Sequence, residues 1–229
     1  MKEAPGLCLY ATYHAILKIH FDESNAELMQ LFRCVMSRIF LVWSPPPHQV
    51  FQAFAAVLLS DDEQKDMNEI LPYLGSLLSG TMPGDNAPIT PLHTSLCDFL
   101  LDATESHAFP IDLGQHSQEE IAWACLRIMN NGLDFNMCKL PTSFALNSQI
   151  KDLPQRVKEH ISPGLCYACL STAQHLQSTL QQSITHLNTI DQENVSAHSQ
   201  RLQLKGLDIT EELKCFLQHK FGLRLVFEG

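Results

Sequence analysis

The chain has 229 residues, 45% of them hydrophobic, which is enough for one large domain or two small ones. Its 25 acidic residues outnumber its 15 basic ones, giving a formal net charge of −10. That balance argues against binding to nucleic acid or to an anionic membrane, because both need clustered Lys and Arg. The longest apolar runs fall short of the roughly 18–20 residues that cross a bilayer, so no transmembrane helix is expected. The eight cysteines are dispersed through apolar helical patterns, which favours reduced, buried thiols in a cytoplasmic protein.

Apolar residues recur at helical spacing through the first 75 positions. The prolines at 45–47 end one helix and open the next, because a proline disfavours helix at the preceding residue and is tolerated in a first turn. Asp61 or Asp62 is expected to cap the helix that follows. Helices are predicted over residues 7–20, 26–43, 48–59 and 61–74.

Residues 77–101 predict a short hairpin that runs directly into a helix. The candidate strands are Leu77–Thr81 and Ile89–Leu92, joined by a turn rich in Pro, Gly and Asn. Thr94 or Ser95 would cap the helix. Three helices, a two-stranded wing and a final helix follow the order of a winged-helix domain. Residues 29–110 contain three basic and nine acidic residues, so a protein-facing winged helix is favoured over a DNA-binding one.

The remaining chain also favours helices. Ser117 and Glu120 match a capping box that would open a helix ending near Gly132. A loop with apolar anchors, among them Phe135, Phe144 and Leu146, precedes a short helix over residues 152–160. Residues 189–204 have the composition of a flexible linker, and a last helix is predicted over residues 208–221. The longest helix opens at Ser162-Pro163, with an inward apolar stripe of Leu165, Cys169, Ala173, Leu176, Leu180, Ile184 and Leu187.

Cys166 and Cys169 form a C-x-x-C motif, but a zinc site needs four convergent ligands. At i and i+3 of a helix the two thiols would share one buried face, so core cysteines are the favoured interpretation. A metal- or thiol-dependent enzyme using this pair is the alternative. The sequence contains neither a G-x-S-x-G elbow nor a G-x-x-x-x-G-K-[ST] loop. We therefore expect no catalytic residues, no metal and no cofactor.

Several segments, in their order and spacing, resemble the part of fungal NACHT-type STAND NTPases that follows the nucleotide-binding NACHT domain. The resemblance covers roughly residues 7–176. Its main segments are Leu77–Thr81, Pro88–Leu100, Ala122–Met129, Phe135–Leu140, Asn147–Leu153 and Ile161–Cys169.

The resemblance implies a mainly α fold, a winged-helix-like module with a small two-stranded wing followed by an α-helical module. In such nucleotide-dependent switches the winged-helix histidine contacts the ADP β-phosphate, and by motif match this residue is His93. Exposed N–H groups at the helix start would add to that anion site. The expected division is residues 1–25 as an N-terminal helix at the end of the missing NACHT region, 26–110 as the winged helix, 111–188 as the helical domain, 189–206 as the linker and 207–229 as a truncated C-terminal helix.

Without a NACHT domain, the chain is expected to be a truncated, non-catalytic fragment of a cytoplasmic signalling switch. Its partner would be a protein, either a NACHT domain or a related STAND protein in trans, with no nucleic acid and no membrane. A stand-alone helical adaptor that binds full-length NACHT relatives is the alternative.

Overall fold

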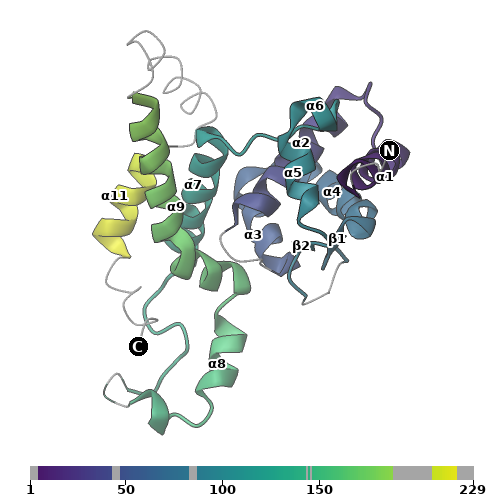
Figure 1. Cartoon of the computed structure of the whole chain (residues 1–229). Helices are drawn as coiled ribbons and strands as arrows, with labels where there is room; N and C mark the ends of the chain where they lie inside the picture. The colour runs from purple at the N-terminus through teal and green to yellow at the C-terminus, as the bar shows by residue number, and fades with distance from the viewer. Residues whose placement is uncertain are drawn as a thin grey trace. The chain divides into compact units, whose positions relative to one another are not determined.

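A computed structural model describes residues 5–42, 47–82, 87–142, 144, 146–187 and 208–220. In this part the chain is mainly helical with a small two-stranded antiparallel sheet, which confirms the predicted fold class (Figure 1). The chain divides into two compact units, Met1–Ile121 (unit 1) and Ala122–Gly229 (unit 2). The predicted linker at 189–204 lies outside the described residues. None of the described helices is long and apolar enough to span a membrane.

The helices and strands predicted for unit 1 are present with small shifts at their ends, and the structure adds a short helix at Ala103–Ser106, where a loop was expected. They are α1 (Pro5–His20), α2 (Ala26–Leu41), α3 (His48–Leu58), α4 (Asp61–Ile70), the 3₁₀ helix η1 (Leu71–Ser76), β1 (Leu78–Ser79), β2 (Thr90–Pro91), α5 (Ser95–Leu101), α6 (Ala103–Ser106) and the start of α7 (Gln115–Gly132). Unit 2 contains the rest of α7, η2 (Asn147–Gln149), α8 (Leu153–His160), α9 (Pro163–Leu187) and α11 (Ile209–His219).

Two predicted helix caps are wrong. Ser60 caps α4: its hydroxyl accepts from the Glu63 N–H at 3.4 Å, and the Glu63 carboxylate accepts from the Ser60 N–H at 2.9 Å. The neighbouring aspartates instead lie in the first turn, where the helix dipole favours negative charge. The capping box at Ser117 does not form, because α7 begins two residues earlier and the Ser117 hydroxyl donates to the Asp112 carbonyl at 3.2 Å.

The core of unit 1 is built around buried aromatic rings. Phe32 is fully buried, with ring centroids 4.9 Å from Phe21 and 5.6 Å from Phe109. Phe99 of α5 is also fully buried and contacts the ring of Tyr13 at 5.4 Å. Through such contacts α1 packs on α5 and α6 and belongs to the same core as the hairpin.

The hairpin is short and its turn depends on one glycine. Leu78 pairs with Pro91 and Ser79 with Thr90, and the Ser79 and Thr90 hydroxyls lie 2.6 Å apart. Gly80 has φ of +67°, and a Cβ there would lie 2.6 Å from two backbone carbonyl oxygens across the turn. Only glycine fits this combination of left-handed backbone and close approach. Outside this sheet, an isolated antiparallel bridge pairs Pro47, just before α3, with Pro88, two residues before β2.

In unit 2, α9 buries a different face from the one predicted. Leu165 and Cys169 are buried as expected, but Leu180 is 63% exposed. The buried positions farther along the helix are polar: Ser171, Thr172, His175 and Thr179. Threonines can be buried this way because their hydroxyls donate to backbone carbonyls of their own helix, Thr172 to Ala168 and Thr179 to His175 at 2.9 Å.

The loop before α8 also differs from the prediction. Three of its expected apolar anchors are exposed, Phe135 at 79%, Phe144 at 92% and Leu146 at 66%, whereas Met137 and Leu140 are half-buried. Polar contacts to Arg156 of α8 hold this loop instead, because its guanidinium donates to the carbonyl of Lys139 at 2.8 Å.

Candidate functional site at the hairpin–α5 junction

His93 lies between β2 and α5, where the hairpin passes into the helix, and its side chain is exposed. Its Nδ1 accepts from the Ser95 backbone N–H at 3.1 Å and lies 2.7 Å from the Ser95 hydroxyl. The Ser95 hydroxyl is in turn 2.8 Å from the hydroxyl of Tyr13, a buried residue of α1. Three side chains therefore form a continuous hydrogen-bonded chain from the core to the surface.

The directions of these hydrogen bonds assign the tautomer of the imidazole. An N–H can only donate, so Nδ1 of His93 is an acceptor and the neutral ring carries its proton on Nε2. The Ser95 hydroxyl then donates to Nδ1, and Tyr13 donates to Ser95. The junction thus fixes the ring with a single N–H donor, at Nε2.

Thr94 occupies the N-cap position of α5, as predicted, but the side chain that accepts a backbone hydrogen bond at this helix start belongs to His93. Thr94 is the residue before the helix, but its side chain makes no capping hydrogen bond. The N–H groups of Leu96 and Cys97 donate to the carbonyls of His93 and Thr94, both at 3.1 Å. These groups are not available to an anion, and the expected contribution of exposed backbone N–H groups is wrong for Ser95, Leu96 and Cys97. The imidazole of His93 is therefore the candidate donor for an anion at this junction.

The charge around the site is acidic. Residues 1–121 contain 16 of the 25 acidic but only 5 of the 15 basic residues. The four basic side chains that the structure describes in unit 1 all have partners. Lys18 pairs with Glu23 at 3.1 Å, Lys65 with Asp62 at 3.1 Å and Arg38 with Glu120 at 3.4 Å, and Arg33 donates to the Ala108 carbonyl at 2.9 Å. Among the described residues, unit 1 presents no cluster of cations for nucleic-acid phosphates.

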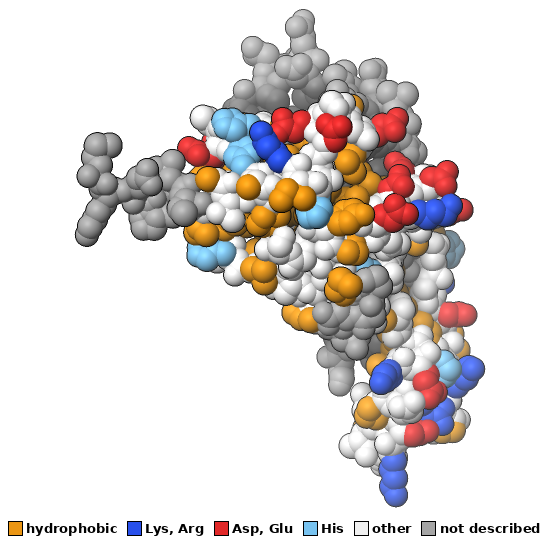
Figure 2. Space-filling model, turned by 90° about the vertical axis from the view of Figure 1, so that its right-hand side faces the viewer, with side chains coloured by type: hydrophobic (Ala, Val, Ile, Leu, Met, Phe, Trp, Pro, Cys, Tyr) orange, Lys and Arg blue, Asp and Glu red, His pale blue; other side chains and the backbone are white. Residues whose placement is uncertain are grey.

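The surface of unit 1 also exposes large apolar side chains. Figure 2 shows hydrophobic and histidine side chains interspersed on one face of the molecule, with acidic side chains nearby. Among the described residues of unit 1, the exposed large apolar side chains are Ile19 (75%), Tyr73 (49%), Met82 (57%), Leu92 (61%) and Leu101 (47%). Leu92 directly precedes His93, so an apolar contact is available next to the imidazole.

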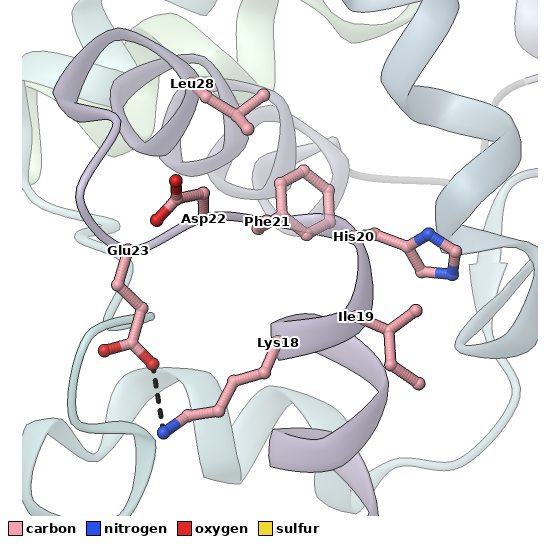
Figure 3. Close-up of a pocket in the computed structure, with 7 residues that line it drawn as sticks. All are labelled: Lys18, Ile19, His20, Phe21, Asp22, Glu23 and Leu28. Atoms are coloured by element: carbon pink, nitrogen blue, oxygen red, sulfur yellow. Dashed lines mark ion pairs between the residues drawn. The ribbon is translucent and has the colours of Figure 1, made fainter.

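An open depression of about 450 Å³ lies at the turn between α1 and α2 (Figure 3). Its polar groups bind one another: Lys18 pairs with Glu23, and Asp22 accepts from the N–H and hydroxyl of Ser24 at 2.9 and 2.8 Å. These two hydrogen bonds lower the pKa of Asp22. We assign the depression a structural role, because its charged groups already have partners in the turn.

The structure disfavours a reactive thiol at Cys97 and at Cys125. The C-x-x-C pair does not share a buried face as predicted, since Cys166 is exposed and Cys169 is buried. Burial raises the pKa of the Cys125 thiol to about 12, and burial together with Asp98 raises the pKa of Cys97, so both environments disfavour the nucleophilic thiolate. No group of three or more metal-ligating side chains occurs within the described ranges.

Sequence reasoning proposed His93 as a site residue but gave no role to Tyr13 or to the hydroxyl of Ser95. Ser95 has a local signal, because a serine two residues after a histidine can reach its ring. Tyr13 has none, since it is 82 positions from Ser95 and only the packing of α1 on α5 brings the two together.

The fold and the site thus define a mainly helical protein with a two-stranded hairpin whose exposed histidine is oriented by a hydrogen-bonded chain. No family model, no curated protein and no solved structure matches the chain.

Proposed function

We propose that this chain is a non-catalytic module of a NACHT-type STAND switch that docks onto a NACHT domain in trans. The observation that carries the proposal is the fixed orientation of His93, whose only N–H donor is the exposed Nε2. A phosphate oxygen of ADP held by the partner would accept from this N–H. The exposed Leu92 beside it offers apolar area for the same contact.

Two further observations support a protein partner. The acidic balance of unit 1 and the engagement of its described cations disfavour nucleic acid. The exposed apolar side chains on unit 1 are the kind of surface that protein interfaces cover. The alternative function, a stand-alone helical adaptor, would bind full-length NACHT relatives through the same surface. The two proposals differ only in whether the chain belongs to a protein that has its own NACHT domain.

The first test is nucleotide binding by the chain alone. With one imidazole donor and no cationic cluster among the described residues of unit 1, ADP or ATP should produce no heat of binding and no thermal shift. A micromolar affinity for either nucleotide would contradict the proposal.

The second test separates the imidazole donor from its structural role. In His93→Asn, the side-chain oxygen can still accept from the N–H two residues on, as in an Asx-turn, but Nε2 is lost. In His93→Ala both functions are lost, and we expect about 1 kcal/mol of destabilisation, as for other lost caps.

The assay is pull-down of a recombinant NACHT domain from a full-length relative, with and without ADP. We expect binding by the wild type to be stronger with ADP, and His93→Asn to lose that increase while keeping wild-type stability. Equal ADP dependence in the wild type and His93→Asn would refute the phosphate contact.

A further inference from the structure

Helix α9, the long helix of unit 2 (Figure 1), carries a seven-residue repeat on its exposed side. Its members follow alternating steps of four and three residues, the a/d spacing with which coiled-coil helices bury a stripe against each other. The members up to Leu180 are all exposed, Leu170 at 61% and Leu180 at 63%. We call this stripe the α9 seam. It consists of Cys166, Leu170, Ala173, Gln177 and Leu180, and the sequence continues the spacing at Ile184 and Leu187 within the same helix.

The opposite side of α9 is already occupied. Thr172, His175 and Thr179 are buried, with His175 only 1% exposed and its Nε2 2.9 Å from the Tyr167 hydroxyl. The burial of this polar face, together with the Thr172 hydroxyl 3.8 Å from the Met129 sulfur of α7, places it against the rest of unit 2. If α9 rotated so that the seam became buried, the hydrogen-bonded side chains of Tyr167 and His175 would be exposed to water. The α9 seam therefore stays on the solvent-exposed side of the helix.

The charge pattern indicates what covers the seam. None of the 25 residues of α9 is Asp, Glu, Lys or Arg, although charged residues make up 17% of the chain. Interhelical salt bridges at the positions flanking a seam normally select a partner. Here no described flanking residue is acidic or basic; they are Tyr167, Cys169, Gln174, Leu176 and Gln181. Two copies of a chain with net charge −10 repel each other generally, but along α9 no like charges are brought together.

A seam without charge is also self-complementary. An interface between identical chains around a two-fold axis uses the same patch twice, so charges of one sign are unfavourable there and a neutral stripe is suitable. Gln177, at the centre, fits the same requirement, because its amide offers both donors and an acceptor and can pair with an identical amide.

We propose that the α9 seam pairs with the α9 seam of a second copy of this chain, forming a homodimer. The leucines of the seam supply the apolar area of the contact, and the central glutamine reduces its strength, as a polar residue at a seam position does in coiled coils. This surface lies in unit 2 and does not depend on the function proposed for His93.

The test is the mass of the full chain by analytical ultracentrifugation from about 1 to 100 μM, a range that spans weak to moderate self-association. We expect the wild type to reach twice its 25.8 kDa within this range. The double variant Leu170→Glu, Leu180→Glu places carboxylates along both paired seams and should remain a monomer at every concentration. Because both leucines are exposed, the far-UV circular dichroism of the variant should match that of the wild type.

Two matched variants make the assay specific. Leu217→Glu changes a leucine that is 54% exposed on α11, outside the seam, and should dimerise like the wild type. Gln177→Leu replaces the polar centre of the seam with apolar area and should lower the dimer dissociation constant by about tenfold, equivalent to about 1.4 kcal/mol. A wild-type monomer at the highest concentration, or a dimer that persists in the Leu170→Glu, Leu180→Glu variant, would overturn the proposal.

Discussion

Gly80 closes the hairpin that leads to His93, and replacing it by alanine tests whether this turn has the geometry described. The backbone φ of +67° costs an L-residue about 1–2 kcal/mol relative to glycine. The added Cβ would lie 2.6 Å from the carbonyl oxygens of Ala87 and Pro88, and both oxygens belong to the backbone, so the turn itself must move. Such overpacking costs about 1–3 kcal/mol.

The two costs are partly offset, because alanine restricts the unfolded chain more than glycine does, by about 0.4–1 kcal/mol. The expected net destabilisation of Gly80→Ala is therefore about 2–4 kcal/mol. Urea unfolding followed by circular dichroism measures it directly. The matched control is Gly75→Ala, where the nearest atom to a new Cβ is the side-chain oxygen of Thr81 at 3.3 Å, and we expect a change within about 1 kcal/mol. A Gly80→Ala variant as stable as the Gly75→Ala control would refute the described turn.

Two further predictions concern buried polar groups. Glu120→Leu removes the carboxylate that lies 3.4 Å from the guanidinium of Arg38, which is only 6% exposed, and should lower the free energy of unfolding in urea by about 3–5 kcal/mol. Adding Arg38→Met should recover most of this loss. If the effects of the two substitutions are additive, the pairing is contradicted. Burial lowers the pKa of His175 to about 4 from 6.5, so the unfolded state binds the proton more tightly and stability falls as the pH drops from about 6.5 to 4. His175 should contribute about 3 kcal/mol to the fall in the free energy of unfolding between neutral pH and about pH 4, measured by urea unfolding. This contribution should be absent in His175→Gln. The same pH dependence in the wild type and in His175→Gln would contradict the depressed pKa.

Helix and strand positions in unit 1 could be predicted from the sequence because the apolar spacing and the punctuating residues agree. The hairpin between β1 and β2 follows from two short apolar segments around a Pro- and Gly-rich turn, and α3 begins directly after the prolines at 45–47. Caps were harder to predict, because several polar residues stand near each helix start and only the backbone conformation selects one. At α4 the selected residue is Ser60, one position before the aspartates.

The candidate site was predictable only in part, because some of its residues are far apart in the sequence. His93 stands out locally because it precedes a helix, but its orientation depends on Ser95 and on the Tyr13 hydroxyl from another helix. At α9 the hydrogen bonds that accompany the buried polar face lie within the helix itself. Periodicity predicts that leucines are buried, but the Tyr167–His175 hydrogen bond and the hydroxyls of Thr172 and Thr179 satisfy a polar core face.

The wrong prediction for α9 bears on the proposed dimer, because leucines that were expected in the core are exposed on the α9 seam. An apolar stripe is retained in a sequence without destabilising the fold only if something covers it or if it is narrow enough to be tolerated in water. The α9 seam is narrow, with Ala173 and Gln177 between its exposed leucines, which suits a weak, concentration-dependent pairing better than an obligate interface. The residues that carry the dimer lie in unit 2, and those that carry the proposed phosphate contact lie in unit 1. Each set can therefore be changed without touching the other, and the loss of one property by mutation would leave the second available as an internal control for folding.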